Sequence, residues 1–87
     1  FPEIDASMTR EELAAATKAV DSRLVALGGG AYAGLGFKLK ALKAAGFDDR
    51  GPPASPARLA AYARLARVLD AQGEAATMDS VIAALAA

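Results

Sequence analysis

Three consecutive glycines, residues 28–30, constrain the fold of this chain more than any other feature of its sequence. Glycine is a poor helix former and is favoured just beyond helix ends, so a run of three terminates a helix that reaches it. Three further glycines and three lysines follow before Phe47. We interpret residues 28–30 as the connection between two helices, the second of which spans about 31–45.

Large apolar residues recur along this second helix at spacings of three, four and three, which predicts one buried face formed by Tyr32, Leu35, Leu39 and Leu42. Gly46 is the expected left-handed stop, and Phe47 is expected to fold back on the last turn. Gly34 and Gly36 each cost a helix about 1 kcal/mol relative to alanine. Retaining both suggests that another backbone approaches this helix closely.

Capping patterns place the other helices. Thr9 with Glu12 forms a capping box before a helix over about 10–27. Ser55 followed by Pro56 starts a helix over about 56–71, and Thr77 caps a short helix over about 78–86. The sequence therefore predicts an all-α fold, a small bundle of about four helices with a glycine-rich first connection.

The remaining segments lack helical periodicity. Residues 1–8 are expected to form an extended N-terminal arm, or to be a cloning remnant, before a single helical domain over 9–87. Residues 48–55 contain two prolines and a glycine and are interpreted as a loop. The adjacent Asp48 and Asp49 lack further oxygen ligands, so no metal site is predicted there.

Alanine contributes 24 residues, about half of the apolar 54%. Alanine favours helix but buries little area, so we expect a thin core that a partner or a second copy completes. The chain has no cysteine and no histidine, which excludes disulfides, zinc sites built on these ligands and Ser-His or cysteine nucleophiles within it. No catalytic residue, cofactor or small-molecule substrate is predicted.

The net charge is zero, but the charges are unevenly distributed. Residues 1–37 sum to −2, residues 38–67 to +5 and residues 68–87 to −3. A basic centre suits nucleic acid, an anionic lipid surface or neutralisation by the chain's own acidic ends. The candidates for nucleic-acid or lipid contact are Lys38, Lys40, Lys43, Arg58, Arg64 and Arg67.

Residues 25–45 also allow a strand, a glycine turn and a helix, as in a phosphate-binding βα unit, although Ala33 stands where the dinucleotide fingerprint needs glycine. Through residues 28–30 and 42–44 the stretch resembles the oxyanion loop and following helix of patatin-like lipases. That resemblance implies an α/β hydrolase with a G-x-S-x-G elbow, and neither Ser55 nor Ser80 has the flanking glycines.

Residues 65–85 resemble the first two helices of helix-turn-helix DNA-binding domains, which implies a nucleic-acid-binding function. The second of these helices lacks Arg, Lys, Asn and Gln, the side chains that usually read bases. Contact with nucleic acid would therefore come from the basic middle of the chain.

We expect a non-enzymatic helical protein–protein interaction module, a docking or adaptor domain or a small structural subunit of a larger assembly. The expected partner-binding residues are Phe1, Ile4, Tyr32, Gly34, Gly36, Phe37 and Phe47. The alternatives are a nucleic-acid-binding domain and a helical subunit at a membrane surface, since the apolar residues 24–37 are too few to span a bilayer, which takes about 20. With no signal peptide or transmembrane span recognised in the sequence, a cytoplasmic location is the default expectation.

Overall fold

The computed structural model describes residues 1–47 and 55–87, which form an all-α bundle. Helix α1 (Arg10–Leu27) begins at the predicted capping box. The Thr9 hydroxyl accepts a hydrogen bond from the Glu12 backbone N–H at 3.1 Å, and the Glu12 carboxylate accepts one from the Thr9 N–H at 2.9 Å. Each group satisfies a backbone donor that the first helical turn leaves unpaired.

Helix α2 (Ala31–Ala44) follows α1 after the glycine connection. The N–H of Gly30 donates to the Val25 carbonyl at 2.9 Å, which closes the end of α1. Gly46 has φ 97°, and the N–H of Phe47 donates to the Leu42 carbonyl at 2.9 Å. Both helices thus end in the glycine-dependent motif that the sequence predicts for the second.

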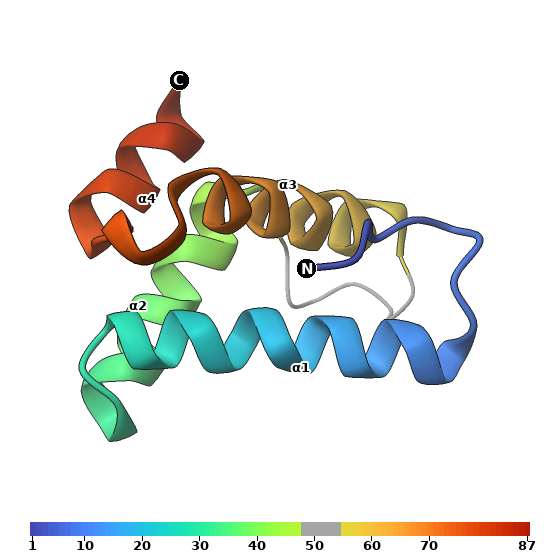
Figure 1. The fold of residues 1–87 in the computed structure, drawn as a ribbon, viewed down its shortest axis with the longest axis horizontal. Coiled ribbons are helices and arrows are strands. Elements are labelled where there is room, and N and C mark those ends of the chain that lie inside the picture. Colours follow the sequence, from blue (N-terminus) through green and yellow to red (C-terminus); the bar gives the residue numbers. More distant parts are fainter. Residues whose placement is uncertain (48–54) are drawn as a thin grey trace.

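The second half of the chain contains α3 (Pro56–Gln72), a single 3₁₀ turn η1 (Gly73–Ala75) and α4 (Met78–Ala86). The predicted caps are confirmed, because Ser55 accepts from the N–H of Arg58 and Thr77 accepts from the N–H of Ser80. In Figure 1, α1 and α3 run in the same direction across the view, α2 crosses them steeply and α4 packs at the end of α3.

The core lies where these four helices meet. Val20 and Leu24 from α1, Leu65 from α3 and Val81 from α4 are fully buried, and much of the remaining buried surface comes from alanine. The expected buried face of α1 is confirmed around Thr17, Val20 and Leu24. Seven of the seventeen buried apolar residues in the described part of the chain are alanines, and such small side chains let the helix backbones come close together.

A close backbone approach joins α1 and α2. A Cβ atom added at Gly34 would lie 2.3 Å from the Val25 carbonyl oxygen, so only glycine fits at this crossing. The predicted close approach is therefore confirmed at Gly34. The prediction of a close approach is wrong at Gly36, because a Cβ added there would meet no other atom of the described residues within 4 Å.

This crossing also decides which face of α2 is buried. The buried residues are Gly34, Phe37, Ala41 and Leu42. Of the face predicted to be buried, only Leu42 is, and Tyr32, Leu35 and Leu39 are exposed. The prediction was wrong because it ranked faces by side-chain size, whereas the position of Gly34 at the crossing fixes the face that contains Gly34, Phe37 and Ala41 as the one that packs inwards.

The βα and lipase interpretations of the glycine stretch are also wrong. Val25, Ala26 and Leu27 belong to α1, and the described residues contain no strand. The loop and the acidic pair predicted in residues 48–55 lie outside the described residues except for Ser55, which caps α3.

Candidate docking surface on α2

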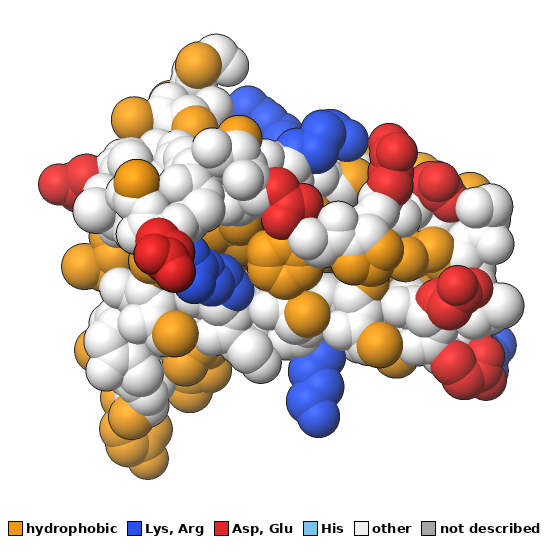
Figure 2. Space-filling view, viewed as in Figure 1, with side chains coloured by type: hydrophobic (Ala, Val, Ile, Leu, Met, Phe, Trp, Pro, Cys, Tyr) orange, Lys and Arg blue, Asp and Glu red, His pale blue; other side chains and the backbone are white. Residues whose placement is uncertain are grey.

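An apolar stripe without a partner runs along the outer face of α2. It consists of Tyr32, Leu35 and Leu39, which we call the α2 stripe, with exposed fractions of 91%, 45% and 58%. Their spacings of three and four place them next to one another on a helix surface. Figure 2 shows hydrophobic side chains gathered at the lower left, where α2 begins. Single exposed apolar residues are ordinary, but a contiguous group of them is typical of an interaction site.

A shallow hollow of about 370 Å³ lies beside the stripe, between α2 and α4. Its α2 side includes Gly36 and Lys40, and its α4 side includes Met78, Asp79 and Ile82. Gly36 is three residues before Leu39 and four after Tyr32, so it joins the hollow to the stripe. Met78 is 47% exposed, which extends the apolar surface onto α4.

Lys38, Lys40 and Lys43 make α2 strongly basic, since its fourteen residues include no acid. Among the described residues, no hydrogen bond or ion pair joins these three lysines to another side chain. Lys40 lines the hollow, and Lys43 lies in the last turn, where its charge complements the negative end of the helix dipole. Within residues 1–47 and 55–87, the α2 stripe is thus accompanied by three positive charges that form no ion pair, and the nearest acid named at this surface is Asp79, which lines the same hollow as Lys40.

Five of the seven predicted partner-binding residues divide into an exposed group and a buried group. Tyr32 and Gly36 lie at the surface of α2. Ile4 and Phe37 are only 4% and 6% exposed, and Gly34 is buried against α1. These three stabilise the chain's own fold, so they are not available to a partner in this conformation.

Phe47 belongs to a cluster between the end of α2 and the start of α3. Its ring lies edge-on to the ring of Tyr62 at 6.2 Å, and the Arg58 guanidinium lies over both rings, 5.7 and 5.1 Å from their centres. The Tyr62 hydroxyl donates to Asp21 on α1 at 2.8 Å. Burial, reinforced by the Asp21 carboxylate, raises the pKa of Tyr62 to about 12, because both disfavour the phenolate. This cluster holds α1, α2 and α3 together.

The predicted basic residues do not form one surface. Arg58 stacks on aromatic rings, and the Arg64 guanidinium donates to the Leu85 carbonyl at the end of α4. Arg67 is exposed on α3, whereas the three lysines belong to α2. Two of the three arginines therefore support the fold.

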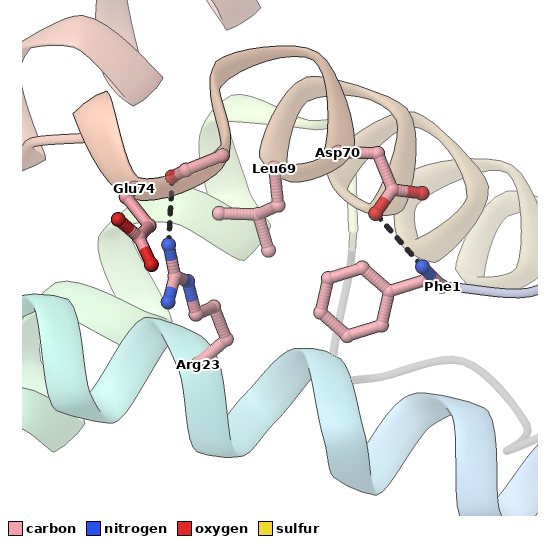
Figure 3. A pocket seen from close by; sticks show the side chains of 6 residues that line it. Phe1, Arg23, Leu69, Asp70 and Glu74 are labelled. Atoms are coloured by element: carbon pink, nitrogen blue, oxygen red, sulfur yellow. Dashed lines mark hydrogen bonds and ion pairs between the residues drawn. The ribbon is translucent and has the colours of Figure 1, made fainter.

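Phe1 lies at a second hollow, of about 290 Å³, shown in Figure 3. Its ammonium group pairs with the Asp70 carboxylate at 2.8 Å. Across the hollow the Arg23 guanidinium donates to the Gly73 carbonyl at 2.7 Å and lies beside Glu74 (Figure 3). Residue 1 is thus packed on α3, and its side chain is 18% exposed.

Sequence reasoning missed Leu35 and Leu39 as surface residues, because it assigned both to a buried face. The spacing of the lysines could have indicated that this face is exposed. Lys40 and Lys43 follow Gly36 at spacings of four and seven, which places these charges on the same side of the helix as Tyr32 and Leu39. A face that carries lysines faces solvent or an anionic partner.

The described residues contain neither a candidate metal site nor a helix that could span a membrane. Within 1–47 and 55–87, no group of three or more Asp and Glu residues is placed to hold a metal ion. No helix in these same ranges combines the length and the apolar character needed to cross a bilayer.

Comparisons of the chain with protein-family models, curated proteins and solved structures gave no match.

Proposed function

We propose that this chain is a non-enzymatic helical protein–protein interaction module, a docking or adaptor domain or a small subunit of a larger assembly, and that it docks through the α2 stripe. The observation that carries the proposal is the exposure of Tyr32, Leu35 and Leu39 as neighbours on one helix face. Helices present such residues to the groove or helix of a partner.

The energetics of burial support this function. Fully burying an aliphatic or aromatic side chain contributes about 1.5–3 kcal/mol, so covering three of them gives a partner a useful gain. Of the three side chains, Tyr32 has the most surface left for a partner to bury, because it is almost fully exposed. The core formed by Val20, Leu24, Leu65 and Val81 is complete without the stripe, so a partner would not have to disrupt the fold.

Site-specific photo-crosslinking tests the proposal. A benzophenone amino acid at position 39, and separately at position 35, should give adducts of the mass of a second protein chain in cells of the source organism. Ala15 is the matched control position, because it is exposed on α1 about 15 Å along the helix from Val25. Adducts that form equally at position 15, or none at positions 35 and 39, would refute the proposal. Mass measured at several concentrations would identify a second copy as the partner.

A further inference from the structure

We propose that the partner segment covering the α2 stripe is an acidic amphipathic α-helix, which lies along α2 with an apolar ridge over the hollow between α2 and α4. This inference rests on the proposed function and names the chemistry of its partner. Two independent observations lead to it: the positive charge of α2, and the shape of the surface around Gly36.

The positive charge of α2 favours a negatively charged partner. Lys38 and Lys43, with Lys40 between them, are five residues or about 7.5 Å apart along the helix axis, slightly less than the Debye length of about 8 Å at physiological ionic strength. They therefore act together as one positive field beside the apolar stripe. A partner that buries the stripe brings its own flanking side chains to these ammonium groups, and carboxylates there are favourable. A second copy docked through α2 would instead bring six lysines together.

The shape around Gly36 fits the ridge of a helix. With no side chain at Gly36, the surface sinks between the α2 stripe and the α4 side chains Met78 and Ile82. Large apolar side chains at spacings of three and four form a ridge that enters such a groove. Helix α2 is about 21 Å long, so a partner helix of four turns would cover it.

Asp79 disfavours the main alternative occupant, an anionic lipid surface. Asp79 lines the hollow from α4, and Lys40 lines it from α2. A bilayer surface would press phosphate headgroups against both residues, and Asp79 would repel them. A helix carries its carboxylates at fixed positions, so it can place them over Lys40 and Lys43 and keep them away from Asp79.

An unbiased peptide selection tests the inference. A display library of 20-residue helical peptides, randomised on all faces without charge bias, would be selected on the whole chain. We expect enriched peptides to carry apolar residues at spacings of three and four and a net negative charge. Their dissociation constants should rise about tenfold or more with Gly36→Leu, which fills the groove, and with the double variant Lys40→Glu/Lys43→Glu.

Matched controls separate the groove from general effects. Ala15→Leu adds the same side chain on exposed α1 and should leave the dissociation constant unchanged within about twofold. The Gly36→Leu chain should remain helical by circular dichroism, because an added Cβ meets nothing within 4 Å.

The outcomes distinguish this inference from the proposed function. Enriched peptides that are neutral or basic, or that bind Gly36→Leu as well as the original chain, overturn the inference. If their binding still depends on Leu39, tested by Leu39→Ser, the proposed function survives. No enrichment, or co-sedimentation of the chain with phosphatidylserine vesicles in place of peptide binding, also overturns the inference.

Discussion

The hydroxyl of Tyr62 on α3 donates a hydrogen bond to the carboxylate of Asp21 on α1 at 2.8 Å, and this bond fixes the two helices side by side. The ring of Tyr62 is buried, with Arg58 and Phe47 packed against it. Phe47 comes directly after the stop of α2 at Gly46. One tyrosine therefore links three helices, including the helix that carries the candidate docking surface.

Removing either partner of this bond should destabilise the fold. We expect Tyr62→Phe and Asp21→Ala each to lower the free energy of unfolding by about 1–2 kcal/mol, because a hydrogen bond to a charged acceptor is lost. The double variant should lose less than the sum of the two single losses, since the second substitution has no bond left to break. Urea unfolding of the four chains measures this coupling. Fully additive losses would show that the bond contributes nothing.

The same tyrosine should make the fold sensitive to alkali. Its pKa in the folded chain, about 12, lies above its ordinary value of 10.0, so the folded state holds the phenol proton more tightly than the unfolded state. The protonated Tyr62 side chain therefore stabilises the folded state fully below about pH 10, and this contribution to the free energy of unfolding is lost as the pH rises towards 12. In a Tyr32→Phe background Tyr62 is the only tyrosine, so its phenolate absorbance reports the titration directly.

The control for this alkaline effect is Tyr62→Phe. Its free energy of unfolding should fall less steeply between pH 10 and 12 than that of the original chain, because the group that titrates is gone. An identical slope in both chains would contradict the assignment of the alkaline loss to Tyr62.

Substitution by alanine should lower the free energy of unfolding at one glycine of α2 and raise it at another. Gly34→Ala places a Cβ 2.3 Å from the Val25 carbonyl oxygen, so α1 and α2 must move apart, and we expect a loss of about 2 kcal/mol or more. Gly36→Ala meets nothing within 4 Å and should gain about 1 kcal/mol from helix propensity. Thermal and urea unfolding of the pair provide the measurement. Equal effects would mean that the two helices do not cross at Gly34.

The sequence predicts the helix boundaries well because they depend on local chemistry. Thr9, Ser55 and Thr77 each satisfy backbone donors within three residues, and Gly46 takes the left-handed conformation that ends α2. Such signals lie within one turn of the helix ends that they determine. The predicted ends of α2 and α3 differ from the observed ends by one residue.

The candidate docking surface could not be predicted in the same way. Periodicity shows that Tyr32, Leu35 and Leu39 share a face, but the burial of that face depends on a contact with another helix. The crossing at Gly34 turns the face with Gly34, Phe37 and Ala41 inwards, and this is a property of the α1–α2 pair. The Tyr62–Asp21 bond is likewise invisible in the sequence, because its partners are 41 residues apart.

Leu39 and Leu42, one turn apart on α2, provide the most direct test of which face is free. Leu42 is 3% exposed and Leu39 is 58% exposed, although the sequence predicted both to be buried. Leu42→Ala should cost about 2–5 kcal/mol, because it leaves a cavity in the core. Leu39→Ala should change the free energy of unfolding by no more than about 0.5 kcal/mol, since it removes surface that already contacts water.

The two substitutions are matched in chemistry and helix propensity, so they differ only in what surrounds the side chain. Urea unfolding at low protein concentration, where a self-associated form would dissociate, gives the intrinsic values. A large loss at position 39 that depends on protein concentration would indicate a second copy on the α2 stripe. A large loss independent of concentration would mean that Leu39 is part of the core, and the stripe would no longer be available to any partner.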